Sequence, residues 1–175
     1  MEFDFHILSP IDKEVPALRS GRKSIVILHE SIRGCKLYGS VILDNARFGV
    51  DNLNYDLVIA GDIHKPQFLR PNIAYSGSLI QKNRGEGLDH GCILWKIGPN
   101  ITGEFIKLKL LSAYVEVKAF ANELYLPNDN FENIIYLEFV HSNCEQHKVK
   151  EFVDIIMKRY NVLHNVVDVT MTSAG

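Results

Sequence analysis

Asp62 and His64 stand two residues apart just after a short apolar run, and both side chains are common metal ligands. The run covers residues 57–60 and stops at Gly61, as expected of a buried strand that ends at the edge of a sheet. Residues i and i+2 of an extended segment point the same way, so we expect Asp62 and His64 to address one centre together. An oxygen and a nitrogen ligand so placed suit a divalent ion such as manganese or zinc.

A second apolar run, residues 24–28, ends at His29. If the two runs form neighbouring strands, then His29, Asp62 and His64 would supply three ligands to one or two ions, mounted on rigid elements. A histidine that follows a strand is also commonly a surface residue or a hydrogen-bonded one. His29 taken alone therefore leaves both interpretations open.

The stretch that follows His64 is basic and rich in polar groups. Residues 65–84 contain four Lys or Arg side chains and no acidic one. Cationic, hydroxyl and amide donors near a metal site are what a phosphate ester needs. The candidate substrate-binding residues are Lys65, Ser76, Ser78 and Gln81. A solvated loop of the same composition is an equally simple interpretation.

Length, charge and cysteine content restrict the class of protein. A chain of 175 residues favours one domain, or one domain with a small appendage. A net charge of -2 argues against a protein that coats nucleic acid by charge alone, but not against an enzyme whose metal ions supply positive charge locally. The three cysteines are widely spaced, without a CxxC pair, which indicates a reducing intracellular compartment, cytoplasmic or nuclear. No apolar stretch approaches the ~20 residues of a membrane span.

Periodicity divides the chain into two parts and predicts an α/β (α+β) fold. Segments rich in Val, Ile, Leu and aromatic residues are predicted strands: 3–8, 24–28, 57–60, 91–97 and 104–110. Residues 31–54 and 73–79 are expected to be irregular. We expect a first domain over residues 1–111 and a small module over 112–175.

The small module is predicted to be a βαβ unit. Its strands are expected at residues 134–140 and 165–171, on either side of a helix at 145–160 that Ser142 or Asn143 would cap. The helix carries one apolar stripe: Val149, Phe152, Val153, Ile156 and Tyr160.

The segments GDIHKPQ, AYSGSLIQKNRGE and HGCILWKI together resemble the calcineurin-like metallophosphoesterases, and most of all their SbcD-type DNA double-strand-break repair nucleases. His29 matches the isolated strand-end histidine of that family. Residues 61–64 match its G-H-x-H motif, and residues 75–78 match the YSGS or YPGS segment that follows. The resemblance covers roughly residues 20–110.

This resemblance implies a fold, an activity and partners. The fold would be the C-terminal part of a metallophosphoesterase β-sandwich flanked by helices, followed by a small βαβ capping module. The activity would be that of a metal-dependent phosphodiesterase or DNA nuclease, an exonuclease or endonuclease of the DNA-repair class. The cofactor would be Mn²⁺ in a two-metal site, with Mg²⁺ or Zn²⁺ as alternatives. The implied partners are DNA and an SMC-like ATPase subunit of the SbcC type, with a homodimer as a further option and no membrane.

The chain also departs from the family pattern. Asp62 stands where the family has a histidine, and a carboxylate is compatible with manganese or magnesium. Residues 4–6 and 62–64 both spell the family's D-x-H motif, but neither is followed by a G-D-x-x-D or G-N-H motif. We interpret the first match as a coincidence and prefer the later G-H-x-H assignment for the second. Only 28 residues precede His29. We therefore expect no catalytic residue in this chain, which would be a C-terminal portion acting with the missing N-terminal half of the catalytic domain. The alternatives are a phosphoesterase acting on small phosphoesters or nucleotides, and a non-catalytic interaction module.

Overall fold

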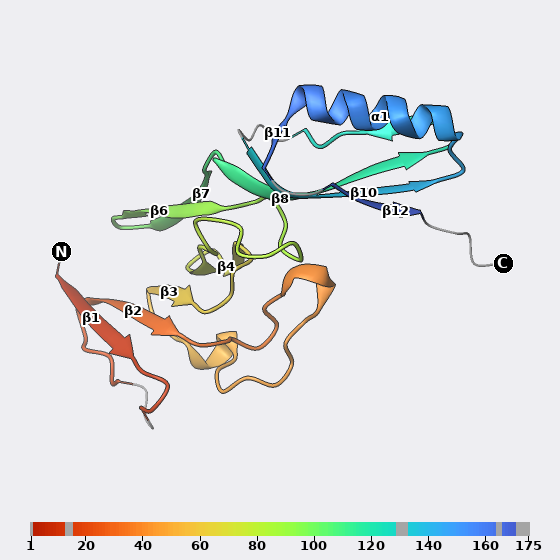
Figure 1. The fold of residues 1–175 in the computed structure, drawn as a ribbon. Coiled ribbons are helices and arrows are strands. Elements are labelled where there is room, and N and C mark those ends of the chain that lie inside the picture. Colours follow the sequence, from red (N-terminus) through yellow and green to blue (C-terminus); the bar gives the residue numbers. More distant parts are fainter. Residues whose placement is uncertain (1, 13–15, 129–132, 164–165, 171–175) are drawn as a thin grey trace. The chain divides into compact units, whose positions relative to one another are not determined.

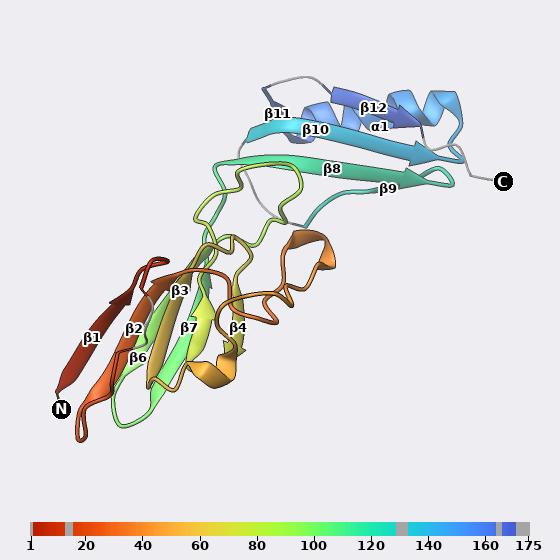
Figure 2. The same ribbon diagram turned by 90° about the horizontal axis from the view of Figure 1, so that it is seen from below.

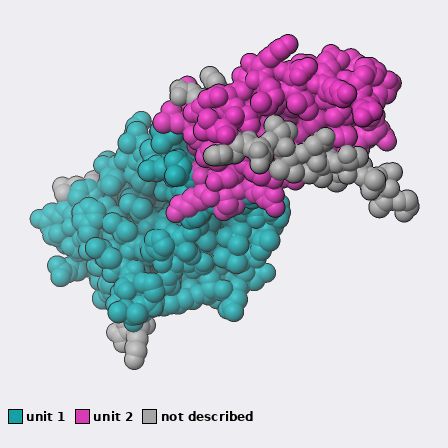
Figure 3. Space-filling model, in the orientation of Figure 1, with its two compact units in different colours: residues 1–80, 85–108 teal, residues 81–84, 109–175 magenta. Residues whose placement is uncertain are grey.

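The computed structural model describes residues 2–12, 16–128, 133–163 and 166–170. Its fold is mixed α/β and mostly sheet, with a single α-helix in those residues (Figure 1). The chain divides into two compact units, residues 1–80 with 85–108 (unit 1) and residues 81–84 with 109–175 (unit 2) (Figure 3). The predicted boundary at residue 111 lies close to this division along the chain, but residues 81–84 group with unit 2.

Unit 1 contains a five-stranded sheet in the order β1 (Phe3–Leu8), β2 (Lys23–His29), β3 (Leu57–Gly61), β5 (Ile73–Tyr75) and β4 (Gln67–Arg70) (Figure 2). The first four strands in this order pair in parallel, and β4 is antiparallel to β5. The expected strands at 3–8, 24–28 and 57–60 are confirmed. The segment expected to be irregular around residue 73 contains β5, whose three residues are all buried. Three residues are too few to show a period.

One face of this sheet carries the core of unit 1. The irregular segment between β2 and β3 covers that face and includes two short 3₁₀ turns, Tyr38–Ser40 and Val50–Asn52. Buried side chains of the core include Val26, Leu28, Ile32, Phe48, Leu53, Val58 and Tyr75. Helices were expected to flank this sheet, but in the described residues the α-helix belongs to unit 2. Gly34 and Gly39 both have positive φ in the covering segment, a conformation that the interior of an α-helix does not allow.

The opposite face is covered only in part. The hairpin of β6 (Gly91–Ile97) and β7 (Ile101–Lys107) packs against it (Figure 1). The rings of Trp95 and Phe68 meet edge to face there, with their centroids 5.8 Å apart. The expected strand at 104–110 thus begins and ends three residues earlier. Beyond the hairpin, three apolar side chains on β1 and β2 remain exposed: Phe5 at 66%, Ile7 at 77% and Ile27 at 40%.

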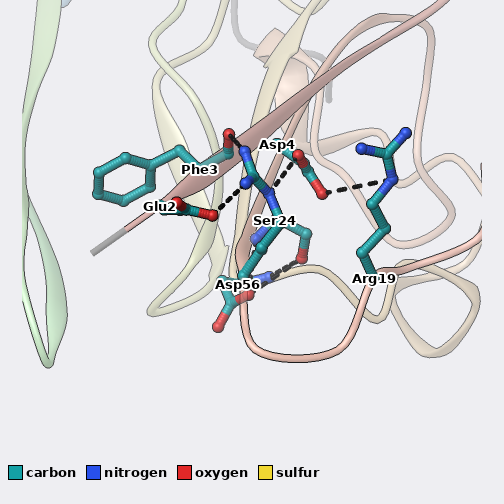
Figure 4. A network of polar contacts seen from close by, with 7 residues as sticks. Glu2, Phe3, Asp4, Arg19, Ser24 and Asp56 are labelled. Carbon is teal, nitrogen blue, oxygen red and sulfur yellow. Dashed lines mark hydrogen bonds and ion pairs between the residues drawn. The ribbon is translucent and has the colours of Figure 1, made fainter.

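A carboxylate joins β2 to β3 at their amino-terminal ends. Asp56 accepts hydrogen bonds from Lys23 Nζ at 2.7 Å and from the Ser24 backbone N–H at 2.8 Å. The Ser24 hydroxyl lies 3.0 Å from the same carboxylate (Figure 4). Partial burial alone would raise the pKa of Asp56, but the bonds from Lys23 and Ser24 outweigh burial, so the pKa is lowered.

Arg22 fastens β1 to the same end of the sheet. Its guanidinium donates to Asp4 at 2.7 Å and to the Phe3 carbonyl at 2.9 Å, and it pairs with Glu2. Figure 4 labels these three partners. Arg19 approaches the other oxygen of Asp4 at 4.0 Å. These contacts hold β1 at the edge of the sheet, where it has β2 as its strand neighbour.

Unit 2 is a sheet with one helix along it (Figure 1). The central strand is β10 (Asn133–Ser142), which pairs in parallel with β8 (Ser112–Phe120), β11 (Asn161–Val162) and β12 (Val166–Thr170). A short β9 (Glu123–Tyr125) lies antiparallel to β8.

The expected strand–helix–strand order of the small module is confirmed as β10, α1 (Gln146–Arg159) and β12. Within the predicted stripe, Phe152, Ile156 and Tyr160 are buried. Glu145 occupies the N-cap position without a side-chain cap bond, so the expected caps Ser142 and Asn143 were wrong. Residues 165 and 171 of the predicted closing strand lie outside the described residues. None of the described helices is long and apolar enough to cross a membrane.

Candidate functional site

The predicted ligands lie where β2 and β3 end. The two strands are parallel, and His29 stands in register with Gly61. The imidazole of His29 lies over the Gly61 backbone, since a Cβ added at Gly61 would come 2.8 Å from His29 Cδ2. A glycine at position 61 thus gives the ring its place, and the His29 side chain stays exposed.

Asp62 turns the chain away from the strand direction. Strand β3 ends at Gly61, and Asp62 has φ of 90°, a conformation rare for a residue with a Cβ. The rule that i and i+2 point the same way holds for extended segments, so it does not extend to Asp62 and His64. The Asp62 carboxylate instead accepts a hydrogen bond from the Ser31 hydroxyl at 3.0 Å. This bond links the loop after β3 to the loop after β2.

His64 is held through both its ring and its backbone. Its Nδ1 lies 2.8 Å from an oxygen of Glu86, whose side chain is only 5% exposed, against 40% for His64. Its carbonyl accepts a hydrogen bond from the Ser78 N–H at 3.1 Å. Glu86 was not among the predicted site residues. The one available signal was that it is the first acidic residue after the basic stretch 65–84.

The three predicted ligands do not form a complete metal centre by themselves. Among the residues that the structure describes, no group of three or more His, Cys, Asp or Glu side chains could hold a metal ion. In the described residues, His29, Asp62 and His64 are not drawn together into such a group. Their part in a centre completed by further donors stays a prediction.

The two serines predicted to bind substrate, Ser76 and Ser78, have different surroundings. Ser76 lines an open pocket of about 310 Å³, whose walls also include His29, Gly61 and the apolar Ile27 and Ile59. Ser78 instead supports the structure, because its N–H bonds the His64 carbonyl and its hydroxyl lies 3.1 Å from Nδ1 of a buried histidine, His90. Ser76 is thus placed to meet a ligand, and Ser78 to hold the loop.

Gln81 is buried in unit 2, where its side-chain amide bonds both backbone groups of Tyr114. The Tyr114 N–H donates to Oε1 at 2.8 Å, and Nε2 donates to the Tyr114 carbonyl at 3.1 Å. This pairing occupies the amide that was expected to bind substrate. Lys65, directly after His64, is half-buried, with its ammonium 5.9 Å from the centroid of the Tyr38 ring.

Tyr75, the first residue of the YSGS segment, holds the loop after β2 in place through hydrogen bonds. It is fully buried, its hydroxyl donates to the Glu30 carbonyl at 2.7 Å, and it accepts from the Ile32 N–H at 2.8 Å. Burial raises the pKa of Tyr75, so the hydroxyl keeps the proton that it donates. The residues on either side of Ser31 are thereby fixed to β5.

Comparison with known proteins gives two viral relatives, and no family model matches the chain. The "Uncharacterized protein R555" of Acanthamoeba polyphaga mimivirus is 27% identical over 140 residues, covering 78% of this chain and 10% of that protein. The "Putative phosphoesterase 244L" of Invertebrate iridescent virus 6 is 31% identical over 80 residues, covering 46% of this chain and 27% of that protein. The chain thus spans about a tenth and about a quarter of these relatives. The second name concerns a phosphoesterase, and neither name mentions a nuclease or DNA repair.

Proposed function

We propose that this chain forms one edge of a metal-dependent phosphoesterase site, to which it contributes His29, Asp62 and His64. The observation that carries the proposal is their placement where two adjacent parallel strands end, the edge at which such sheets bind ligands. The similarity to a viral protein named as a phosphoesterase supports the same class of reaction. Hydrolysis of a phosphoester bond is therefore the reaction we assign to the assembled site.

Further metal donors have to come from polypeptide outside the described residues, since those residues hold no sufficient group. We propose that this polypeptide covers the open face of the five-stranded sheet, where Phe5, Ile7 and Ile27 are exposed. Parallel sheets are normally covered on both faces. The 310 Å³ pocket lined by Ile7 and Ile27 also reaches His29, so one partner could cover the apolar face and complete the donor set.

A mixed nitrogen and oxygen donor set suits Mn²⁺, with Zn²⁺ or Mg²⁺ as alternatives; Mg²⁺ prefers oxygen ligands. Lys65, next to His64, would bring a positive charge to a phosphate. The described donors do not complete a site for an ion by themselves.

For the substrate, we propose the phosphodiester bonds of DNA, with the chain acting as part of a repair-class nuclease beside an SMC-like ATPase of the SbcC type. What supports this finer assignment is the sequence resemblance alone. A second candidate is a phosphoesterase of small phosphoesters or nucleotides, which the name of the iridescent-virus relative also fits. A third is a non-catalytic module that keeps the open sheet face as a binding surface, which the exposed side chains of Phe5, Ile7 and Ile27 favour.

Titration of the ¹⁵N-labelled chain with MnCl₂ tests the proposed edge. We expect Mn²⁺ to broaden the amide signals of residues 29–31 and 61–64 before others, because a paramagnetic ion acts on nuclei near it. His64→Ala should weaken this effect. His147→Ala is the matched control, since His147 is an exposed histidine that also lies beside a glutamate, at 3.2 Å.

Uniform broadening, or unchanged broadening in His64→Ala, would contradict the proposed edge and favour the non-catalytic module. Hydrolysis of linear duplex DNA and of a small model phosphodiester, each with Mn²⁺, separates the two enzymatic candidates. Faster turnover of DNA supports the nuclease, and faster turnover of the small ester supports the second candidate. Selective binding without turnover of either agrees with a site that needs another polypeptide.

A further inference from the structure

We propose that Glu86 is a positioning residue for His64, which fixes the imidazole with its proton on Nδ1 and leaves Nε2 as the nitrogen that serves the site. The importance of Nε2 rests on the proposed function. The tautomer of His64 does not, and it can be measured without any ion.

The geometry of the pair carries the inference. Nδ1 of His64 and Oε1 of Glu86 are 2.8 Å apart, a short distance for a charge-assisted hydrogen bond. A carboxylate accepts hydrogen bonds, so the proton of this bond belongs to Nδ1. With Nδ1 occupied, the lone pair of a neutral imidazole lies on Nε2, which is the nitrogen a metal ion would take.

The burial of Glu86 makes this bond matter to the site. Its side chain is 5% exposed, and a carboxylate withdrawn from water is costly unless hydrogen bonds satisfy it. The side chain of His64 is 40% exposed, so it lies between the buried carboxylate of Glu86 and the solvent. The imidazole is thus bonded through Nδ1 to a buried group, while 40% of the His64 side chain stays exposed.

A second histidine fixes the turn that carries Glu86. His90 is fully buried, and its Nε2 lies 2.8 Å from the carbonyl oxygen of Gly87, the next residue after Glu86. The Nδ1 of His90 lies 3.1 Å from the hydroxyl of Ser78, whose N–H bonds the His64 carbonyl. Glu86 and the backbone of His64 are therefore tied to the same buried ring.

Tyr38 adds a further contact to this arrangement. Its hydroxyl lies 3.4 Å from the His64 carbonyl and 3.3 Å from the Asp89 carbonyl, and both oxygens are acceptors. Burial, together with the charges of Glu86 and Asp89, raises the pKa of Tyr38 to about 12, so the hydroxyl remains a donor. The loop that carries His64 is thus held by Ser78, Tyr38 and Glu86.

The test is a long-range ¹H–¹⁵N spectrum of the full chain labelled at histidine nitrogens, at about pH 8, where an ordinary imidazole is neutral. We expect His64 to be in the Nδ1–H tautomer in the wild-type chain. Glu86→Ala should shift it toward the Nε2–H form, and Glu86→Gln, which keeps an acceptor oxygen, should retain part of the Nδ1–H population. Glu145→Ala is the control, because it removes the carboxylate of the exposed pair with His147.

An Nε2–H tautomer of His64 in the wild-type chain, or an unchanged tautomer in Glu86→Ala, would overturn the proposal. The wild-type spectrum alone decides if Glu86→Ala does not fold. Addition of MnCl₂ then separates this inference from the proposed function. We expect Glu86→Ala to raise the Mn²⁺ concentration that broadens the His64 ring signals by roughly tenfold or more. An Nδ1–H tautomer with no response to Mn²⁺ would leave the role of Glu86 standing and remove the metal site.

Discussion

Gly77 shows how a residue without a side chain can control the candidate site. Its φ is 76°, and a Cβ at this position would lie 2.6 Å from the carbonyl oxygen of His64. That carbonyl accepts the N–H of Ser78, the next residue. A side chain at position 77 would therefore push the segment that contains Gly77 and Ser78 away from the loop that carries His64.

Gly77→Ala should destabilise unit 1 by more than the cost of positive φ alone, which is about 1 kcal/mol. The reason is the added contact with backbone, which cannot rotate out of the way as a side chain can. Urea unfolding followed by the fluorescence of Trp95, the chain's one tryptophan, measures the loss.

Gly39→Ala is the matched control for this substitution. Gly39 has φ of 77°, but a Cβ there would meet nothing within 4 Å. It therefore bears the conformational cost without the clash. Equal losses in the two variants would show that Gly77 is required only for its dihedral angle.

Asp56 acts between elements, because its carboxylate joins the first residues of β2 to the start of β3. Its pKa is lowered in the folded chain, so its bonds stabilise the fold above the unfolded-state pKa of about 4, and this stabilisation is lost as pH falls through the folded-state pKa. We expect Asp56→Asn to lose about 1–3 kcal/mol of unfolding free energy at pH 7, because bonds to a charged group are removed.

The difference between the two proteins should shrink in acid, as the wild-type carboxyl also takes up a proton. Unfolding curves collected from pH 7 to pH 3 measure this convergence. Asp44→Asn, at an exposed carboxylate, is the control and should follow the wild-type curve. A gap between wild type and Asp56→Asn that stays constant with pH would show that the charge of Asp56 is not what stabilises the fold.

Elements marked by a continuous apolar run or by a clear period could be predicted from the sequence, and elements without either could not. The central strands β2 and β3 are continuous apolar runs, and α1 carries a stripe from Val149 to Tyr160. Strand β5 has only three residues, and the segment between β2 and β3 packs through side chains that show no period, such as Ile32 and Phe48. Their structure depends on partners distant in the sequence.

The candidate site divides in the same way. The ends of β2 and β3 could be read from the sequence, whereas the register that places His29 beside Gly61 comes from the structure. The direction of Asp62 could not, because its positive φ breaks the alternation on which the prediction relied. The contact of Glu86 with His64 could not be predicted either, since the two residues are 22 positions apart and meet only in the folded chain.

At the scale of the molecule, the uneven covering of the five-stranded sheet in unit 1 is the feature with the widest consequence. One face is buried by the core, whereas the other leaves Phe5 and Ile7 exposed on the edge strand β1, and Ile27 exposed on its neighbour β2. Apolar patches next to an open edge favour association with another polypeptide, or with a second copy when that polypeptide is absent. We therefore expect the isolated chain to self-associate.

Ile7→Lys should reduce this self-association, because a charge placed on the exposed face opposes its burial against a second copy. Ile11→Lys is the matched control: Ile11 is 86% exposed, against 77% for Ile7, but lies in the turn after β1 and not on the sheet face. Light scattering over a range of protein concentrations gives the mean molar mass of each variant. A wild-type chain that stays monomeric throughout, or an equal decrease in both variants, would show that the open face is not the surface through which this chain finds a partner.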